Sequence, residues 1–164
     1  MDRSRAAPFV ILIASAAVVG GALLFQHVGG LPPCELCLYE RWPYYAMIVL
    51  SALALAAGRP SVSAWVTGIA ALVFLAGAGL AFYHVGVEQH WFAGPTACTG
   101  PSGTGGSIED FRKQLMAQQP VRCDEPQWML LGVSLAGWNL LASLVLVVFC
   151  LLALRAPALR RRTA

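Results

Sequence analysis

Four long apolar runs, separated by short or polar segments, dominate the pattern of hydrophobic and polar positions along the chain. A helix needs about 20 apolar residues to cross a bilayer, within a range of about 17 to 25. The second run, residues 42–58, is the shortest, so we expect its helix to begin a few residues earlier. The pattern predicts an all-α integral membrane protein, a four-transmembrane-helix bundle with spans at about residues 9–28, 40–58, 64–87 and 128–154.

The composition agrees with this interpretation. Hydrophobic residues make up 58% of the 164 residues and charged residues only 12%, whereas soluble domains carry about 25% charged residues. A chain of this length forms one compact unit, so we expect residues 1–164 to be a single four-helix membrane domain. The first run is longer than the core of a signal peptide, which has about 7 to 15 residues, so we expect it to be retained as a span.

Basic residues mark one side of the predicted bundle. Seven of the eleven Lys and Arg residues lie in the N-terminal segment, in the turn at Arg59 or in the C-terminal tail. With four spans these segments share one side, which the positive-inside rule makes cytoplasmic. We therefore expect both termini in the cytoplasm and the outer loops, about residues 29–39 and 88–127, on the opposite face. The C-terminal arginines also suit contact with lipid head groups.

Four of the five cysteines fall in the two outer loops, Cys34 and Cys37 in the first and Cys98 and Cys123 in the second. Thiols on an oxidising face suggest two disulfides. The fifth cysteine, Cys150, lies deep in the fourth predicted span, where we interpret it as a small core hydrophobe.

The second outer loop contains a predicted helix. After the Gly-rich stretch 100–106, Ser107 is suited to be an N-cap, and apolar residues fall on one helical face of the segment 107–116. We expect a short amphipathic helix here, lying either on the membrane surface or packed on the bundle. The glycines before it would act as a flexible tether for the loop cysteines.

The pair Cys34 and Cys37 has three common interpretations: half of a zinc site, a redox dithiol or a structural disulfide. The sequence offers no second close pair of zinc ligands, and a disulfide across two residues closes too small a loop to stabilise the fold much. A redox role fits better. A helix N-terminus and Arg41 would lower the thiol pKa of Cys37, although Arg41 could equally reach to lipid head groups.

The motif CELCLYER, at residues 34–41, together with the segments HVGVEQHW and GPTACTG, resembles the family of bacterial disulfide bond formation protein B, DsbB. The similarity covers nearly the whole chain in span count, loop lengths and four cysteines. It implies an inner-membrane disulfide oxidoreductase with periplasmic cysteine loops. Such a protein reoxidises a soluble periplasmic thiol oxidase, a DsbA-like protein of the thioredoxin fold, and passes the electrons to a membrane quinone, either ubiquinone or menaquinone.

The resemblance also implies roles for the loop cysteines. Cys98 would form the mixed disulfide with the partner, and Cys123 would be its loop mate. Cys34 would take electrons from that pair through a transient interloop disulfide. Cys37 would face the quinone as a thiolate, in a charge-transfer complex or adduct. Thiol–disulfide exchange moves two electrons from pair to pair in this way.

Other residues would bind the quinone according to the same resemblance. Arg41 matches the family's arginine beside the quinone, and Glu40 in the same motif has a weaker claim. A further functional site is implied near the outer end of the third span, for which His84, Glu88 and His90 are candidates. Each of these three could instead be an ordinary polar residue at a span end.

Three alternatives stay open on the sequence alone. A vitamin K epoxide reductase-like enzyme also combines a small helical bundle with a CxxC motif, but there the motif lies near a late span. A non-catalytic membrane scaffold would hold the same cysteines as structural disulfides, and a metal-binding membrane protein would bind zinc or copper. The sequence contains no P-loop, dinucleotide-binding fingerprint or nucleic-acid motif, so we expect no nucleic-acid partner.

Overall fold

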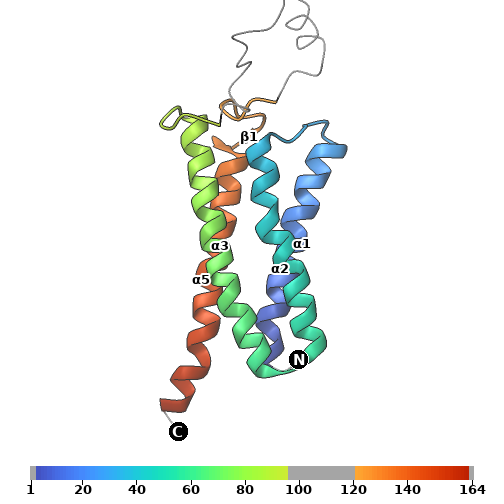
Figure 1. The fold of residues 1–164 in the computed structure, drawn as a ribbon, viewed down its shortest axis with the longest axis vertical. Coiled ribbons are helices and arrows are strands. Elements are labelled where there is room, and N and C mark those ends of the chain that lie inside the picture. Colours follow the sequence, from blue (N-terminus) through green and yellow to red (C-terminus); the bar gives the residue numbers. More distant parts are fainter. Residues whose placement is uncertain (1–2, 96–120, 163–164) are drawn as a thin grey trace, which may run out of the picture.

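A computed structural model describes residues 3–95 and 121–162 of the chain. Within these ranges the protein is an elongated bundle of helices, with the described N- and C-terminal ends at one end and the cysteine-bearing segments at the other (Figure 1). The all-α class is therefore confirmed. The elements, in chain order, are α1 (Arg3–His27), α2 (Glu35–Ala57), α3 (Pro60–Glu88), β1 (Met129–Leu130), β2 (Val133–Ser134) and α5 (Leu135–Arg162).

Among the described helices, α1, α3 and α5 are long and apolar enough to cross a membrane. Helix α2 has 23 residues, but its first two turns carry the charged residues Glu35, Glu40 and Arg41. An apolar core with charges at one end is common where a helix reaches the membrane surface. The four-span count, which needs α2 to cross as well, stays a prediction. The amphipathic helix expected at 107–116 lies outside the described residues.

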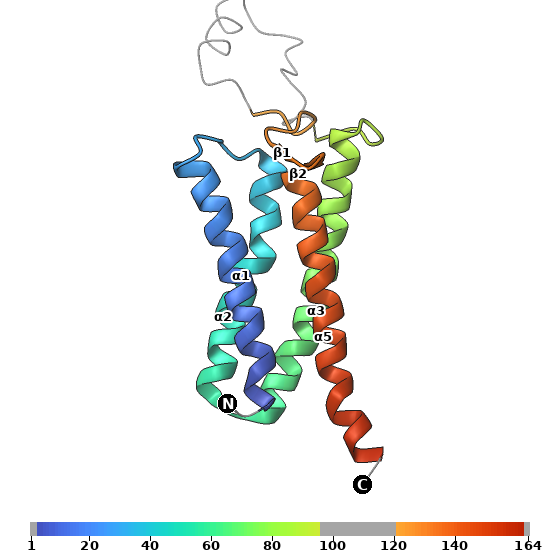
Figure 2. The same cartoon turned by 180° about the vertical axis from the view of Figure 1, so that it is seen from behind.

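The helices pack mainly as two pairs, α1 with α2 and α3 with α5, joined through α2 and α3. Figure 2, seen from behind, places α1 and α5 toward the viewer with α2 and α3 behind them. The central core contains fully buried side chains from all four described helices, including Ile11, Met47 and Phe74. Cys150 is also fully buried in this cluster, as expected for a small core hydrophobe.

Local sequence explains where α2 begins and ends. Cys34 is its N-cap residue, and the Cys34 sulfur accepts a hydrogen bond from the Cys37 backbone N–H at 3.3 Å. At the other end Gly58 adopts a left-handed conformation with φ 64°, which glycine tolerates better than other residues. Pro60 then opens α3 at its first turn, where the missing N–H costs nothing. The first cysteine of the pair is thus fixed by the start of a helix.

Helix α5 begins at Leu135, seven residues after the start expected for the fourth span. The apolar residues before it form the β1–β2 hairpin instead, pairing Met129 with Ser134. Leu131 and Gly132 occupy the turn with φ values of 53° and 78°, which the tightest hairpin turns require. Ser134 then caps α5, because its hydroxyl oxygen accepts a hydrogen bond from the Gly137 N–H at 3.1 Å.

Candidate active site

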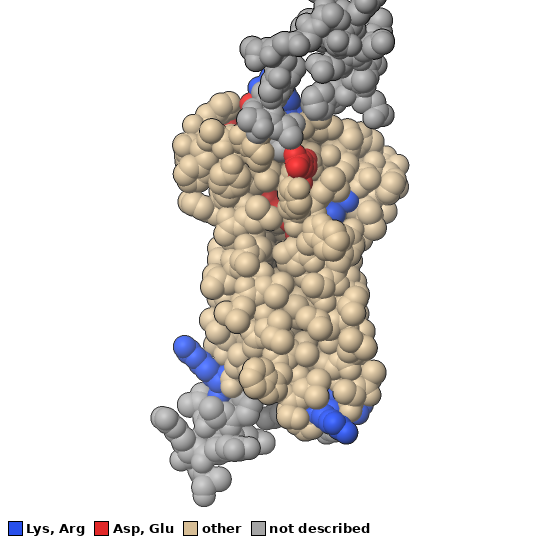
Figure 3. All heavy atoms as spheres, in the orientation of Figure 1, with Lys and Arg blue, Asp and Glu red and all other residues tan. Residues whose placement is uncertain are grey.

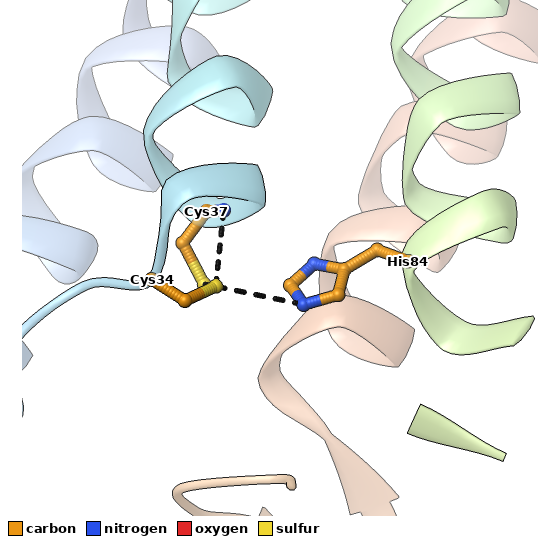
Figure 4. Close-up of side chains that lie close together, drawn as sticks. All are labelled: Cys34, Cys37 and His84. Atoms are coloured by element: carbon orange, nitrogen blue, oxygen red, sulfur yellow. Dashed lines mark hydrogen bonds between the residues drawn. The ribbon is translucent and has the colours of Figure 1, made fainter. Parts of the chain in front are cut away.

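Cys34 and Cys37 lie at the outer end of α2 with their sulfurs 2.8 Å apart (Figure 4). Cys34 is buried and its thiol donates a hydrogen bond to the Cys37 sulfur. That hydrogen bond lowers the pKa of Cys37, because it stabilises the thiolate. The same contact, together with burial, raises the pKa of Cys34. The two thiols are therefore unequal, and Cys37 is the one that ionises first.

The lowered pKa of Cys37 was predicted from the sequence, but from other causes. We expected it from the helix N-terminus and from Arg41. In the structure the principal cause is the hydrogen bond from Cys34, with His84 adding a smaller contribution. The Arg41 guanidinium instead donates a hydrogen bond to Gln26 Oε1 on α1 at 2.7 Å.

His84, from α3, faces the cysteine pair across the bundle (Figure 4). Its Nε2 lies 3.6 Å from the Cys34 sulfur, and its Nδ1 lies 2.7 Å from Glu40 Oε1. Both His84 and Glu40 are buried. An ionised carboxylate can only accept hydrogen bonds, so Glu40 favours the His84 tautomer with hydrogen on Nδ1. The Nε2 lone pair is then directed at Cys34, where it can accept the thiol proton.

A hydrogen-bonded network of Asn139, Tyr44 and Ser143 adjoins Glu40. Asn139 on α5 donates from Nδ2 to Glu40 Oε2 at 2.8 Å. The Tyr44 hydroxyl donates to Asn139 Oδ1 at 2.6 Å and lies 2.8 Å from the Ser143 hydroxyl. Both oxygens of the Glu40 carboxylate therefore have a partner, from α3 on one side and from α5 on the other.

Cys123 lies in the same small buried cluster as Cys34, together with Leu36 and Val87. The second-loop segment that carries Cys123 thus covers the outer end of α2 and α3. Three of the four cysteines that the sequence singled out come together here. The fourth, Cys98, lies outside the described residues.

The remaining sequence candidates, Glu88 and His90, lie at the end of α3 and in the turn after it. Glu88 is the last residue of α3, and its carboxylate accepts a hydrogen bond from the Ser134 hydroxyl, which ties α3 to the start of α5. His90 is exposed in the turn after α3 with a φ of 60°, away from the cavity that adjoins Cys37.

A cavity of about 310 Å³ adjoins Cys37 between α1, α2 and α5. Its polar wall consists of Cys37, Glu40, Arg41, Tyr44, Gln127 and Asn139. The rest of its lining is mainly small or apolar and includes Ala17, Val18, Gly21, Phe25, Ala136 and Trp138. An apolar pocket with a few convergent polar groups is the usual form of a small-molecule site.

The ligand atoms of Cys34, Cys37 and His84 also lie within 4.8 Å of one another, a grouping that could hold a metal ion. Two thiolates on one tetrahedral zinc ion lie about 3.7 Å apart, since each bond is about 2.3 Å long. The observed 2.8 Å between the two sulfurs is shorter than this. Binding one zinc ion would therefore require the two sulfurs to move apart.

Comparison with known proteins agrees with the motif. The family model for disulfide bond formation protein DsbB matches residues 4–153. The chain is 35% identical to disulfide bond formation protein B 2 of Pseudomonas aeruginosa over 91% of each chain. It is 31% identical to disulfide bond formation protein B of Herminiimonas arsenicoxydans over 92% of this chain and 95% of the relative. The chain belongs to the DsbB family.

Membership of the DsbB family confirms the resemblance carried by CELCLYER and replaces the vitamin K epoxide reductase-like alternative. The structure adds residues that sequence reasoning missed, namely Gln26, Tyr44 and Asn139. The signal that could have found Asn139 is its type, since a lone amide inside an apolar run of a membrane protein is a functional candidate by default.

Proposed function

We propose that the protein is an inner-membrane thiol:disulfide oxidoreductase that reoxidises a periplasmic DsbA-like protein and passes the electrons to a membrane quinone. The observation that carries this proposal is the position of Cys37. Cys37, the more acidic thiol of the pair, lines a largely apolar cavity, with Cys34 beside it. A thiolate next to an apolar pocket is suited to donate electrons to an acceptor dissolved in lipid.

The cavity suits the head of a quinone, either ubiquinone or menaquinone. Its small and apolar side chains match a flat ring and a hydrocarbon tail, and Arg41 offers a cation to an electron-rich oxygen. When bound, the quinone supplies a two-electron acceptor. Cys37, Glu40 and Arg41 would hold it, because all three line the cavity. His84 would act on the quinone indirectly, through its contacts with Cys34 and Glu40. The assignment of His90 to the quinone site remains a prediction from sequence.

Electrons would reach Cys37 by thiol–disulfide exchange. A partner thiolate attacks Cys98 of the Cys98–Cys123 disulfide and releases the Cys123 thiolate. Cys123 then attacks Cys34 of the Cys34–Cys37 disulfide and releases the Cys37 thiolate. The burial of Cys34 and Cys123 in one cluster supports this route. When the second partner thiol displaces Cys98, Cys98 attacks Cys123 and releases Cys34.

When the Cys34 thiol and the Cys37 thiolate form their disulfide again, two electrons pass to the acceptor and the proton of Cys34 is released. His84 Nε2 lies where it can take that proton, and Glu40 stabilises the resulting imidazolium through Nδ1–H. These steps assign the proposed catalytic residues: Cys34, Cys37, Cys98 and Cys123 carry the electrons, and His84 and Glu40 handle the proton.

The proposed location is the bacterial inner membrane, with four spans and both termini cytoplasmic. Figure 3 supports this arrangement, because the middle of the visible face carries neither basic nor acidic side chains, and these gather toward its two ends. The cysteine segments lie at the end opposite to the described termini (Figure 1). They would therefore face the periplasm, where the thiol oxidase partner works.

A coupled assay tests the function as a whole. The purified protein in detergent is mixed without oxygen with a reduced DsbA-like protein and a ubiquinone analogue, and quinone absorbance is followed. We expect repeated turnover by the wild type and by Cys150→Ser, whose thiol is buried away from the site. We expect none from Cys37→Ser or Cys98→Ser. Absence of turnover with any quinone and thiol donor would leave a scaffold with structural disulfides as the better account.

A further inference from the structure

The amide of Asn139 makes two hydrogen bonds of opposite direction. Its Nδ2 donates to Glu40 Oε2 at 2.8 Å, and its Oδ1 accepts from the Tyr44 hydroxyl at 2.6 Å. Because an ionised carboxylate can only accept, the N–H end of the amide faces Glu40, and the Tyr44 hydroxyl donates to the oxygen at the other end. The orientation of Asn139 is thus fixed from both sides.

Glu40 is 6% exposed and lies among apolar helices. A buried carboxylate is costly unless its oxygens accept hydrogen bonds. His84 satisfies Oε1 and Asn139 satisfies Oε2, whereas the neighbouring Arg41 donates to Gln26. Asn139 is therefore the partner that keeps the second oxygen of this carboxylate satisfied without adding a charge.

We propose that Asn139 is a positioning residue that, by donating to Glu40, fixes the histidine tautomer that faces Cys34. Without this donor, Oε2 would be buried and unpaired, and the carboxylate would gain by holding a proton or by turning toward another donor. Either change would remove the acceptor that holds hydrogen on His84 Nδ1. The imidazole could then carry its hydrogen on Nε2, facing the sulfur that it has to deprotonate. This inference rests on the proposed function for its kinetic consequence but not for the tautomer itself.

The first test therefore uses no turnover. The reduced full chain, labelled with ¹⁵N-histidine, is studied in detergent by NMR, with His84→Gln identifying the His84 signals. We expect wild-type His84 to show a protonated Nδ1 and an unprotonated Nε2. In Asn139→Leu and Asn139→Asp the two nitrogens should change toward the other tautomer or toward a mixture. Ser143→Ala is the matched control, because Ser143 lies one turn further along α5 and contacts Tyr44 but not Glu40.

The second test is kinetic. Residues that orient metal-ligating histidines typically contribute about 10- to 100-fold, and Asn139 would orient His84 in the same physical way, so kcat at saturating quinone analogue should fall by about that factor in Asn139→Leu. The KM for the quinone analogue should stay within about threefold. Asn139→Gln, which keeps the donor, should recover part of the kcat, and Ser143→Ala should lose little.

The outcomes separate the two proposals. An unchanged His84 spectrum in Asn139→Leu would overturn the positioning role, whatever the activity. A raised KM with an unchanged spectrum would also overturn it and would show that Asn139 contacts the acceptor directly. If the wild type reduced no quinone at all, the proposed function would fail, but the NMR comparison would still decide whether Asn139 sets the His84 tautomer.

Discussion

His84 Nδ1 lies 2.7 Å from Glu40 Oε1, although the two residues are 44 positions apart and belong to different helices. Both side chains are buried. The pair places a hydrogen-bonded histidine directly behind Cys34 and links the cysteine motif of α2 to the outer end of α3. The thiol pair at the start of α2 therefore has a proton acceptor, His84, beside it.

The contacts of His84 with Glu40 and Cys34 predict a large kinetic effect of His84→Gln. Losing a general base typically slows a reaction by about 100- to 10,000-fold, so single-turnover oxidation of the Cys34–Cys37 dithiol should slow by at least about 100-fold. The effect should weaken as the pH rises, because hydroxide increasingly removes the Cys34 proton. Stopped-flow measurement across a pH series checks this.

The three histidines serve as each other's controls in that experiment. His27 is exposed at the end of α1, and His27→Gln should behave as the wild type. His90→Gln decides the sequence-based assignment of His90 to the quinone site. Equal slowing by His84→Gln and His27→Gln would show that the variant effect does not arise from proton transfer.

Cys37 should form a thiolate at a pH below the ordinary thiol pKa of about 9, because Cys34 donates a hydrogen bond to its sulfur. Cys34→Ala removes that donor, so the pKa of Cys37 should rise toward the ordinary value. Thiolate absorbance of the reduced protein, titrated from low to high pH, measures both. Cys37→Ser should remove the low-pH step altogether, and its persistence in that variant would assign the step to another thiol.

The cluster around Cys34 predicts which interloop disulfide forms most readily. In a Cys37→Ser/Cys98→Ser variant, mild oxidation should link Cys34 to Cys123, since both lie in one buried cluster. In Cys34→Ser/Cys98→Ser, the Cys37–Cys123 bond should form more slowly. Peptide mapping by mass spectrometry under non-reducing conditions distinguishes the two bonds. Faster formation of the Cys37–Cys123 bond would contradict the proposed route.

The helices and the cysteine pair could be predicted from the sequence, because each depends on residues that are neighbours along the chain. The apolar runs and the CELC motif are continuous segments, so the helices and the redox pair follow from neighbouring residues. The meeting of Glu40, His84 and Asn139 could not be predicted, because it depends on how α2, α3 and α5 turn their faces toward one another. Only Glu40 and His84 were candidates, and their contact with each other was not foreseen.

The start of α5 shows a different limit. Residues 128–134 are mostly apolar and continue the pattern of the following span, so hydrophobicity alone merged them with the helix. The local turn chemistry carried the missing signal. Gly132 supplies a residue that tolerates positive φ, and Ser134 is a preferred N-cap type.

Arg41 should affect quinone affinity more than chemistry. Arg41→Lys loses the planar guanidinium that contacts Gln26 while keeping the charge. Losing a charge-assisted hydrogen bond from the guanidinium to the quinone would cost about 1.5 to 3 kcal/mol, so the KM for a quinone analogue should rise about tenfold or more. Arg59→Lys, in the turn before α3 at the other end of the bundle, is the matched control. A pure kcat effect would place Arg41 outside quinone binding.

Replacing Gly58, in the turn between α2 and α3, should destabilise the protein. Gly58 has a φ of 64°, which residues with a Cβ rarely adopt, and a Cβ at this position would lie 2.6 Å from Arg5 Nη2. Gly58→Ala should destabilise the protein by about 1 kcal/mol, seen as a lower midpoint of thermal unfolding in detergent. Gly68→Ala is the control, because a Cβ at that helical position meets nothing within 4 Å. Equal midpoints for the two variants would contradict the strain argument.

The most direct test of the central claim is a single turnover without the partner protein. Reduced wild type, Cys150→Ser and Cys37→Ser are each mixed without oxygen with excess ubiquinone analogue, and quinol formed per protein is counted. The account predicts one quinol per protein for the wild type and Cys150→Ser, with a Cys34–Cys37 disulfide as the product. It predicts none for Cys37→Ser. Quinol formation by Cys37→Ser at the wild-type rate, or none by the wild type, would contradict electron transfer from Cys37 to a quinone in the cavity.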